Sequence, residues 1–211
     1  MKMITNILIS VLSFAISYGI AHLTGSVIVK NAVLLAYVIH WIAYIPAYMF
    51  QTEKFYDLTG SVTYLSVVWF VFLYTYKSIS LNFGNLILVL LISIWTIRLG
   101  LFLFIRIHKA GEDKRFRSIK TSASQFFMTF TLSGLWVTLC SMCALVAISS
   151  PEGLVMNALT YAGIILFIIG FDGLISKCFF DIIKFILLSL NACAFIIRSI
   201  FALQPWLPVT I

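Results

Sequence analysis

The chain has 211 residues, of which 62% are hydrophobic, 16% are aromatic and only 10% are charged. Soluble domains are about half apolar and about a quarter charged, so this composition excludes an ordinary soluble protein and predicts an integral membrane protein. The net charge is +7, and six of the 14 basic residues lie between Arg106 and Lys120. Lys and Arg gather in the cytoplasmic loops of membrane proteins, so this cluster indicates topology and we expect no nucleic-acid partner.

Seven apolar segments follow one another along the chain, and each has the length of a helix. The bilayer accepts only helices or closed barrels, and these segments lack the alternation of barrel strands. We therefore predict an all-α fold: a polytopic transmembrane helix bundle of about seven helices, in a single membrane domain over residues 1–211. The predicted helices cover residues 4–23, 32–50, 61–76, 86–107, 126–148, 157–175 and 179–203.

The basic loop between the fourth and fifth segments sets the predicted orientation. The Arg106–Lys120 loop is expected in the cytoplasm, and counting helices backwards places residues 51–57 and the N-terminus with Lys2 on the same side. This predicts a multi-pass protein of a bacterial inner membrane or the endoplasmic reticulum. The lipid bilayer is its first expected partner, and the oligomeric state stays open.

The connection between the second and third segments, "QTEKFYDLTG" at 51–60, is unusually polar for this chain. Glu53 and Asp57 are four residues apart, so one helical turn would place both carboxylates on one face. Together with Tyr56, two acids at a helix mouth would polarise a carbonyl or donate a proton. The alternative is an ordinary helix N-terminus, where the helix dipole favours acids.

Arg98 interrupts the fourth segment nine residues before Ile107, which places it about 13 Å inside the bilayer at 1.5 Å per residue. A charge at that depth costs at least about 2.5 kcal/mol, so we expect it to face the bundle interior and find a carboxylate or backbone carbonyls. Glu53 and Asp57 are the predicted partners. Such a pair is either a structural link between the third and fourth helices or part of a functional site.

The basic loop "RIHKAGEDKRFRSIK" at 106–120 has two interpretations. It contacts lipid headgroups, or its Arg and Lys side chains cradle an anionic cofactor. It contains neither a P-loop nor a GxGxxG motif. Cys140 and Cys143 form a CxxC without a neighbouring histidine, so buried thiols are expected there and no metal site is predicted. His40 belongs to an aromatic stripe that we expect to pack against a neighbouring helix or lipid.

Four stretches occur in order along the chain: "FQTEKFYDLTGSVTY" at 50–64, "RLGLFLFIRI" at 98–107, "GEDKRF" at 111–116 and "GLWV" at 134–137. Together they resemble the steroid 5-alpha-reductase-like membrane family, in its broad branch of uncharacterised bacterial and eukaryotic members, over about residues 30–171. The resemblance implies a membrane reductase in which NADPH enters from the cytoplasm. Hydride then passes to the β carbon of a conjugated enone in a steroid-like or other apolar lipid.

The resemblance also implies roles for particular residues. An acid and a tyrosine at the family's cytoplasmic mouth polarise the substrate carbonyl, and Glu53, Tyr56 and Asp57 match that motif. These three are the predicted catalytic residues, without a choice between the two acids. The predicted cofactor contacts are Arg98, Arg106, Lys114 and Arg115.

The chain departs from the family pattern in two places. Ser133 stands where the family has Gln before the "GLWV" stretch. After Phe171 the family carries an acidic segment, an Arg-His-Pro-Asn-Tyr-like block and a Gly-Glu pair, which supply much of its cofactor site. Residues 172–211 contain none of these and are apolar. A frameshift, a premature end or an alternative transcript would explain this tail, and we expect an incomplete NADPH site.

Three functions therefore stay open at this stage. The first is an NADPH-dependent enone reductase, active or inactive in this form. The second is a non-catalytic protein: a truncated product, a lipid-binding bundle or a partner subunit. The third is a small transporter that uses Arg98 and its acid partners as a relay. Against transport stand the absence of internal repeats and the gathering of polar residues at one membrane face.

Overall fold

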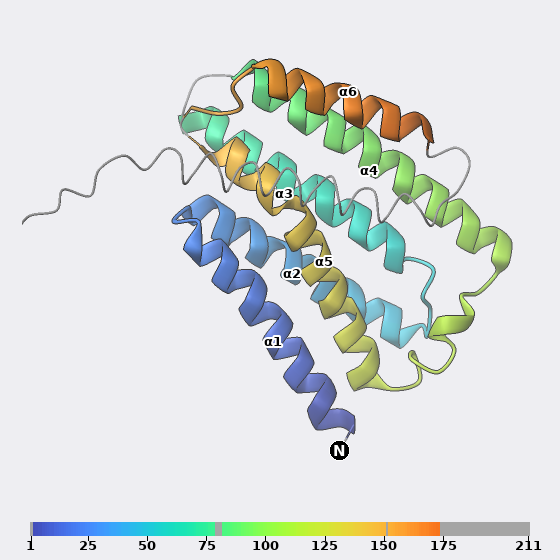
Figure 1. The fold of residues 1–211 in the computed structure, drawn as a ribbon. Helices are drawn as coiled ribbons and strands as arrows, with labels where there is room; N and C mark the ends of the chain where they lie inside the picture. Colours follow the sequence, from blue (N-terminus) through green and yellow to red (C-terminus); the bar gives the residue numbers. More distant parts are fainter. Residues whose placement is uncertain (1, 79–81, 151, 174–211) are drawn as a thin grey trace, which may run out of the picture. The chain divides into compact units, whose positions relative to one another are not determined.

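The computed structural model describes residues 2–78, 82–150 and 152–173, and these residues form helices and short connections with no strand among them. This confirms the predicted all-α fold, and the predicted helix 179–203 lies outside the described residues. The chain divides into two compact units, residues 1–154 and 155–211. The helices are α1 (Lys2–Leu23), α2 (Val27–Met49), α3 (Tyr56–Ser78), α4 (Phe83–Ala110), the 3-10 helix η1 (Lys114–Phe116), α5 (Ala123–Ser149) and α6 (Ala158–Gly173) (Figure 1).

Five helices of the first unit, α1 to α5, are long and apolar enough to cross a membrane. They contain between 22 and 28 residues, in line with the about 20 residues that a span requires. The helix of the second unit, α6, has 16 described residues and is mostly apolar, with Asp172 near its end. The chain is therefore a multi-pass membrane protein.

The third and fourth helices are longer than the sequence predicted. Helix α3 already begins at Tyr56, and the Thr59-Gly60 pair continues it: the Thr59 backbone N–H donates to the Phe55 carbonyl at 2.8 Å. Helix α4 begins after Asn82, whose side chain accepts the Asn85 N–H at 3.0 Å. It ends at Ala110 and is capped by Gly111, where a φ of +79° favours glycine.

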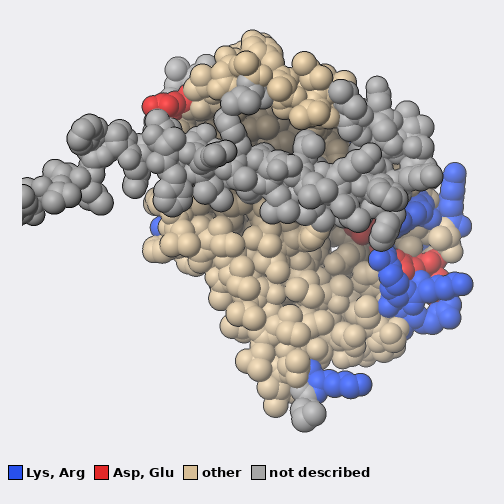
Figure 2. Space-filling model, in the orientation of Figure 1, with Lys and Arg blue, Asp and Glu red and all other residues tan. Residues whose placement is uncertain are grey.

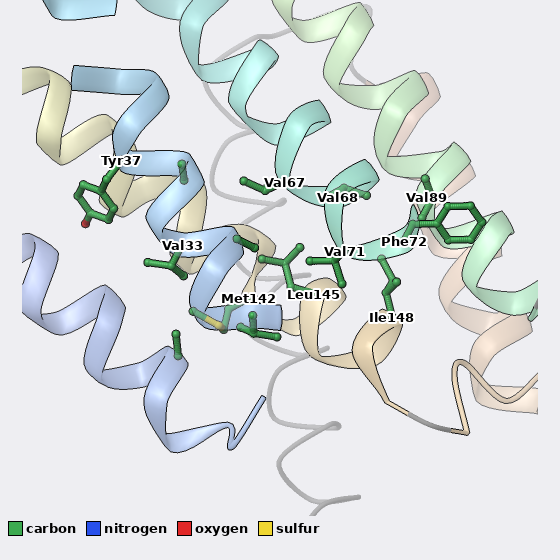
Figure 3. Packing of buried hydrophobic residues seen from close by; sticks show 14 residues of the cluster. Val33, Tyr37, Val67, Val68, Val71, Phe72, Val89, Met142, Leu145 and Ile148 are labelled. Carbon is green, nitrogen blue, oxygen red and sulfur yellow. The ribbon is translucent and has the colours of Figure 1, made fainter. Parts of the chain in front are cut away.

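In the first unit, α2 packs against α1, α3 and α5, while α3 also packs against α4 and α5. The core between these helices contains small and β-branched residues such as Ala32, Val33, Val67 and Val68, together with Leu145 of α5 (Figure 3). Lipid tails are as apolar as such side chains, so close van der Waals packing rather than escape from water holds membrane helices together.

The connections of the first unit meet at two ends. At one end the Asn6 side chain donates to Ser124 at 3.2 Å, and the turn before α3 contacts the loop after α4. At the other end the Asn82 side chain donates to the Glu152 carbonyl at 3.1 Å. The N-terminus, the 51–57 turn and the basic loop thus share one end, as the alternation of helices predicted. Most Lys and Arg side chains visible in Figure 2 gather there. We call residues 50–57 and 106–122 the charged end.

Candidate functional site

Glu53 is the most buried acid of the charged end, with 5% of its surface exposed. Its Oε1 accepts the backbone N–H of Asp113 at 3.0 Å, and its Oε2 accepts a hydrogen bond from Lys120 Nζ at 2.9 Å. Burial opposes the charge of Glu53, but these donors outweigh it and hold the pKa of Glu53 below its ordinary value. Glu53 is thus an ionised clamp that fixes the basic loop to the turn before α3.

Two expectations about the acids are wrong. Glu53 lies in the turn before α3, so it does not share a helical turn with Asp57. The described ion pairs join Glu53 to Lys120 and Asp57 to Arg106, at 3.7 Å for the second pair, so Arg98 is not the cation that holds these acids. Lys120 and Arg106 lie at the end of the bundle, where a charge costs less free energy than it does inside the bundle.

The basic loop neutralises much of its own charge. The Asp113 carboxylate accepts the N–H of Arg115 and binds its guanidinium, with Nε at 3.0 Å, and Glu112 pairs with Arg117. The hydrogen bonds between Asp113 and Arg115 lower the pKa of the carboxyl and raise the pKa of the guanidinium. Lys114, in contrast, is exposed, and no ion pair among the described residues includes it.

Tyr56, the first residue of α3, is held by aromatic neighbours from two other segments. Its ring lies 4.9 Å from that of Phe116 in η1 and 5.2 Å from that of Phe130 in α5, measured between centroids. Its hydroxyl donates to the Thr129 carbonyl at 3.2 Å. Phe116, Phe126, Phe130 and Ala47 form a compact apolar cluster around this position. The tyrosine is therefore fixed where the loop, α3 and α5 meet.

The structure brings most of the predicted site residues to the charged end. Arg115 acts electrostatically on both Tyr56 and Asp57, and Arg106 pairs with Asp57. Arg98 lies eight residues before Arg106 in α4, about 12 Å further along the helix. It is half-buried there. Among the described residues, no group of three or more His, Cys, Asp and Glu side chains is placed to hold a metal ion.

A buried polar group deeper in the bundle was not identified from the sequence. His40 of α2 is fully buried, and its Nε2 lies 3.1 Å from the Ser133 hydroxyl of α5. Its Nδ1 lies 2.9 Å from the Ala36 carbonyl and 3.4 Å from the Thr63 hydroxyl of α3. The sequence offered one signal, the departure from the family pattern at Ser133, while the aromatic neighbours of His40 suggested packing alone.

Comparison with known proteins assigns most of the chain, including the charged end, to one family. A family model described as "Protein of unknown function (DUF1295)" matches residues 43–176, which include the whole charged end and Ser133. No curated protein and no solved structure matches the chain.

Proposed function

The chain belongs to the family of proteins of unknown function DUF1295, whose model matches more than half of its length, and on this premise we propose that it is a membrane-embedded, NADPH-dependent reductase of conjugated enones. The proposed substrates are steroid-like or other apolar lipids. The resemblance to the steroid 5-alpha-reductase-like family supports the reaction. The observation that carries the proposal is the fixed position of Tyr56 beside Asp57 and two arginines at one end of the bundle.

The chemistry requires a donor at the carbonyl oxygen. Hydride addition to the β carbon of an enone moves negative charge onto that oxygen, and a prepositioned donor stabilises the charge as it develops. Tyr56 is this donor: its hydroxyl proton turns from the Thr129 carbonyl to the substrate carbonyl. Burial and the Asp57 charge disfavour negative charge on Tyr56, and the positive charge of Arg115 opposes them. Overall, enone, NADPH and one proton give the saturated ketone and NADP⁺.

The two acids take different parts in this proposal. Both carboxylate oxygens of Glu53 already accept hydrogen bonds, so it serves as a positioning residue that holds the basic loop beside α3. Asp57 is half-buried in the first turn of α3 and keeps Arg106 at the site. We therefore assign proton donation to Tyr56 and the placement of charge to the two carboxylates.

The described residues fit an anionic cofactor in charge. Lys114 is exposed, and Arg106 keeps 47% of its side chain exposed at 3.7 Å from Asp57, which supports both as proposed phosphate contacts. Arg115 and Arg98 remain proposed contacts. When bound, NADPH is the source of hydride. Residues beyond Gly173 lie outside the described part, so the expectation of an incomplete cofactor site stays a prediction. The proposed activity requires NADPH to bind, so binding to the purified chain at micromolar affinity would support the reductase and contradict the incomplete site.

The test is NADPH oxidation by the purified full chain in lipid nanodiscs, with progesterone as the conjugated enone. We expect Tyr56→Phe to lower kcat by about a hundredfold to a thousandfold, as the loss of one oxyanion donor does. Tyr44→Phe is the matched control, because Tyr44 also donates to a backbone carbonyl, that of Ala123 at 3.2 Å. It should retain activity. A wild-type chain without progesterone-dependent oxidation, or an active Tyr56→Phe variant, would contradict the proposal.

A further inference from the structure

The neighbours of His40 determine where its ring proton lies. The Ala36 carbonyl, 2.9 Å from Nδ1, can only accept a hydrogen bond. The Thr63 hydroxyl, also near Nδ1, already donates to the Thr59 carbonyl at 2.8 Å. Both groups facing Nδ1 are thus acceptors, so the neutral ring carries its proton on Nδ1. Its Nε2 is then an acceptor, and the Ser133 hydroxyl at 3.1 Å must donate to it.

Ser133 also lies beside the proposed donor. Ser133 follows Thr129, whose carbonyl accepts the Tyr56 hydroxyl at 3.2 Å, by one helical turn of α5. Residues four apart share one face of a helix, so Ser133 lies on the face of α5 that meets Tyr56. Helix α3 packs against Ser133 here, since a Cβ at Gly60 would lie in ordinary contact with the Ser133 hydroxyl oxygen, at 3.9 Å. Ser133 is therefore placed between two groups that can each accept its proton, the Nε2 atom of His40 and the hydroxyl oxygen of Tyr56.

We propose that Ser133 is a two-position hydrogen-bond switch for Tyr56, with His40 holding the Ser133 proton in the resting state. Without substrate, Ser133 donates to His40 Nε2 and Tyr56 donates to the Thr129 carbonyl. When a substrate carbonyl accepts the hydrogen bond of Tyr56, Ser133 turns its own hydroxyl to donate to the Tyr56 oxygen. No covalent bond changes in this step, because each hydroxyl only rotates about its C–O bond.

The switch rests on the proposed reductase function and deepens it. A hydroxyl that donates to the Tyr56 oxygen stabilises the negative charge that develops there while Tyr56 donates to the enolate. Ser133 and His40 are positioning residues, since neither touches the substrate. Their predicted effects on kcat differ in sign, because Ser133 supplies the stabilising proton, whereas His40 competes for it.

The kinetic test compares variants of these two residues in the progesterone assay. We expect Ser133→Ala to lower kcat about tenfold to a hundredfold with an unchanged KM for NADPH, which matches the loss of one hydrogen bond to a charged group. Ser133→Thr retains the hydroxyl and should restore the rate. His40→Asn keeps a donor for the Ala36 carbonyl and removes the acceptor, so kcat should be unchanged or higher. A purely structural role would lower kcat in both Ser133→Ala and His40→Asn.

His40→Gln serves as the second variant at this buried position, because its carboxamide oxygen reaches towards the place of Nε2. It should hold the Ser133 proton as the wild type does and give wild-type kcat. Thermal unfolding of each variant in detergent separates loss of folding from loss of rate. A Ser133→Ala variant that folds and reaches wild-type kcat would overturn the switch.

The spectroscopic test does not depend on turnover. The His40 signals in ¹⁵N-histidine NMR are those that disappear in His40→Asn. In the resting protein they should show a protonated Nδ1 and a hydrogen-bonded Nε2. Saturating progesterone without NADPH should move the Nε2 signal towards its unbonded position in wild type and leave it unchanged in Tyr56→Phe. Ser133→Ala should show the unbonded position before any ligand is added.

The outcomes separate the switch from the function. If progesterone is reduced and the Nε2 signal does not move when it binds, the switch is wrong and the reductase proposal stands. A protonated Nε2 in the resting protein also overturns the switch alone. If progesterone is neither bound nor reduced, the proposed function fails, and the role of Ser133 in it fails as well.

Discussion

The charged end and the interior of the first unit both supply partners for polar side chains, but with different chemistry. At the charged end, polar contacts are ion pairs, such as Glu53 with Lys120 and Asp57 with Arg106. In the interior, neutral groups bond to one another and to carbonyls. The Ser17 hydroxyl lies 2.8 Å from that of Tyr37, which donates to the Ser13 carbonyl at 2.9 Å.

The cost of desolvation explains this division. A charge near the bilayer centre is expensive, whereas neutral hydroxyls, amides and an uncharged imidazole need only a hydrogen-bond partner. Away from Arg98, the interior of this bundle can therefore be polar without being ionic. The comparison predicts that interior positions respond to volume and to single hydrogen bonds, and that the charged end responds to loss of charge and to pH.

The largest expected effect is crowding of the interior at Gly134. A Cβ there would lie 3.4 Å from the Tyr37 ring and 3.6 Å from His40 Nδ1. Gly134→Leu should force α5 away from α2 and lower the free energy of unfolding by about 3 kcal/mol, measured by thermal unfolding in detergent. Gly19→Leu on α1 is the control, because nothing lies within 4 Å of a Cβ at that position. Equal losses in both variants would mean that α2 and α5 do not pack closely here.

The next effect is at the clamp of the charged end. Glu53→Gln retains an acceptor for the Asp113 N–H and leaves Lys120 without its charge partner. The side chain of Lys120 is 21% exposed, so part of this loss is screened, and we expect a destabilisation of about 2 kcal/mol. Limited proteolysis between residues 111 and 122 should become faster. An unchanged cleavage rate would show that Glu53 does not hold the loop.

The charge of Glu53 also gives the charged end an acid-sensitive contribution to stability. Its pKa in the folded protein lies below the ordinary value of 4.5, so the stabilisation is fully present above pH 4.5 and is lost as the pH falls through the lowered pKa. The difference in unfolding temperature between wild type and Glu53→Gln should therefore shrink below pH 4.5. A difference that persists or grows in acid would contradict an ionised clamp.

A smaller effect is expected from one interior hydrogen bond. Tyr37→Phe removes a hydroxyl that contacts Ser17 and the Ser13 carbonyl, and should cost about 1 kcal/mol of unfolding free energy at any pH from 5 to 8. Tyr18→Phe is the matched control, because the Tyr18 ring stacks on Phe14 and no described hydrogen bond includes its hydroxyl. A pH-dependent loss in Tyr37→Phe would indicate a charged interior.

The smallest effect is expected at the solvent-exposed pair of Glu112 and Arg117. Exposed ion pairs are weakened by water and salt and contribute little. Glu112→Gln should leave the unfolding temperature unchanged within error in 150 mM salt, which makes it the control for Glu53→Gln. A loss as large as that of Glu53→Gln would show that exposure does not distinguish the two pairs.

The sequence predicted the helices well, because long apolar segments between charged turns allow few alternatives in a bilayer. It also predicted that the N-terminus, the 51–57 turn and the basic loop share one end. The partner of Glu53 could not be predicted, since Lys120 is 67 residues away and several basic residues compete for the acid. The depth of Arg98 in the fourth segment was the reason to predict it as the partner of Glu53. The proposed role of Ser133 could be inferred only from its contact with His40 of α2. In the sequence, one Ser and one His 93 residues apart have no spacing that connects them.

The central claim is that Tyr56 serves the reduction of a conjugated enone, and isotope transfer tests it most directly. NADPH carrying deuterium at both C4 positions of the nicotinamide is incubated with progesterone and the purified chain, and the product is analysed by mass spectrometry. We predict a saturated ketone with one deuterium at the former β carbon, formed by wild type and by Tyr44→Phe but scarcely by Tyr56→Phe. Recovery of unlabelled, unreduced progesterone from folded wild-type protein would contradict the claim.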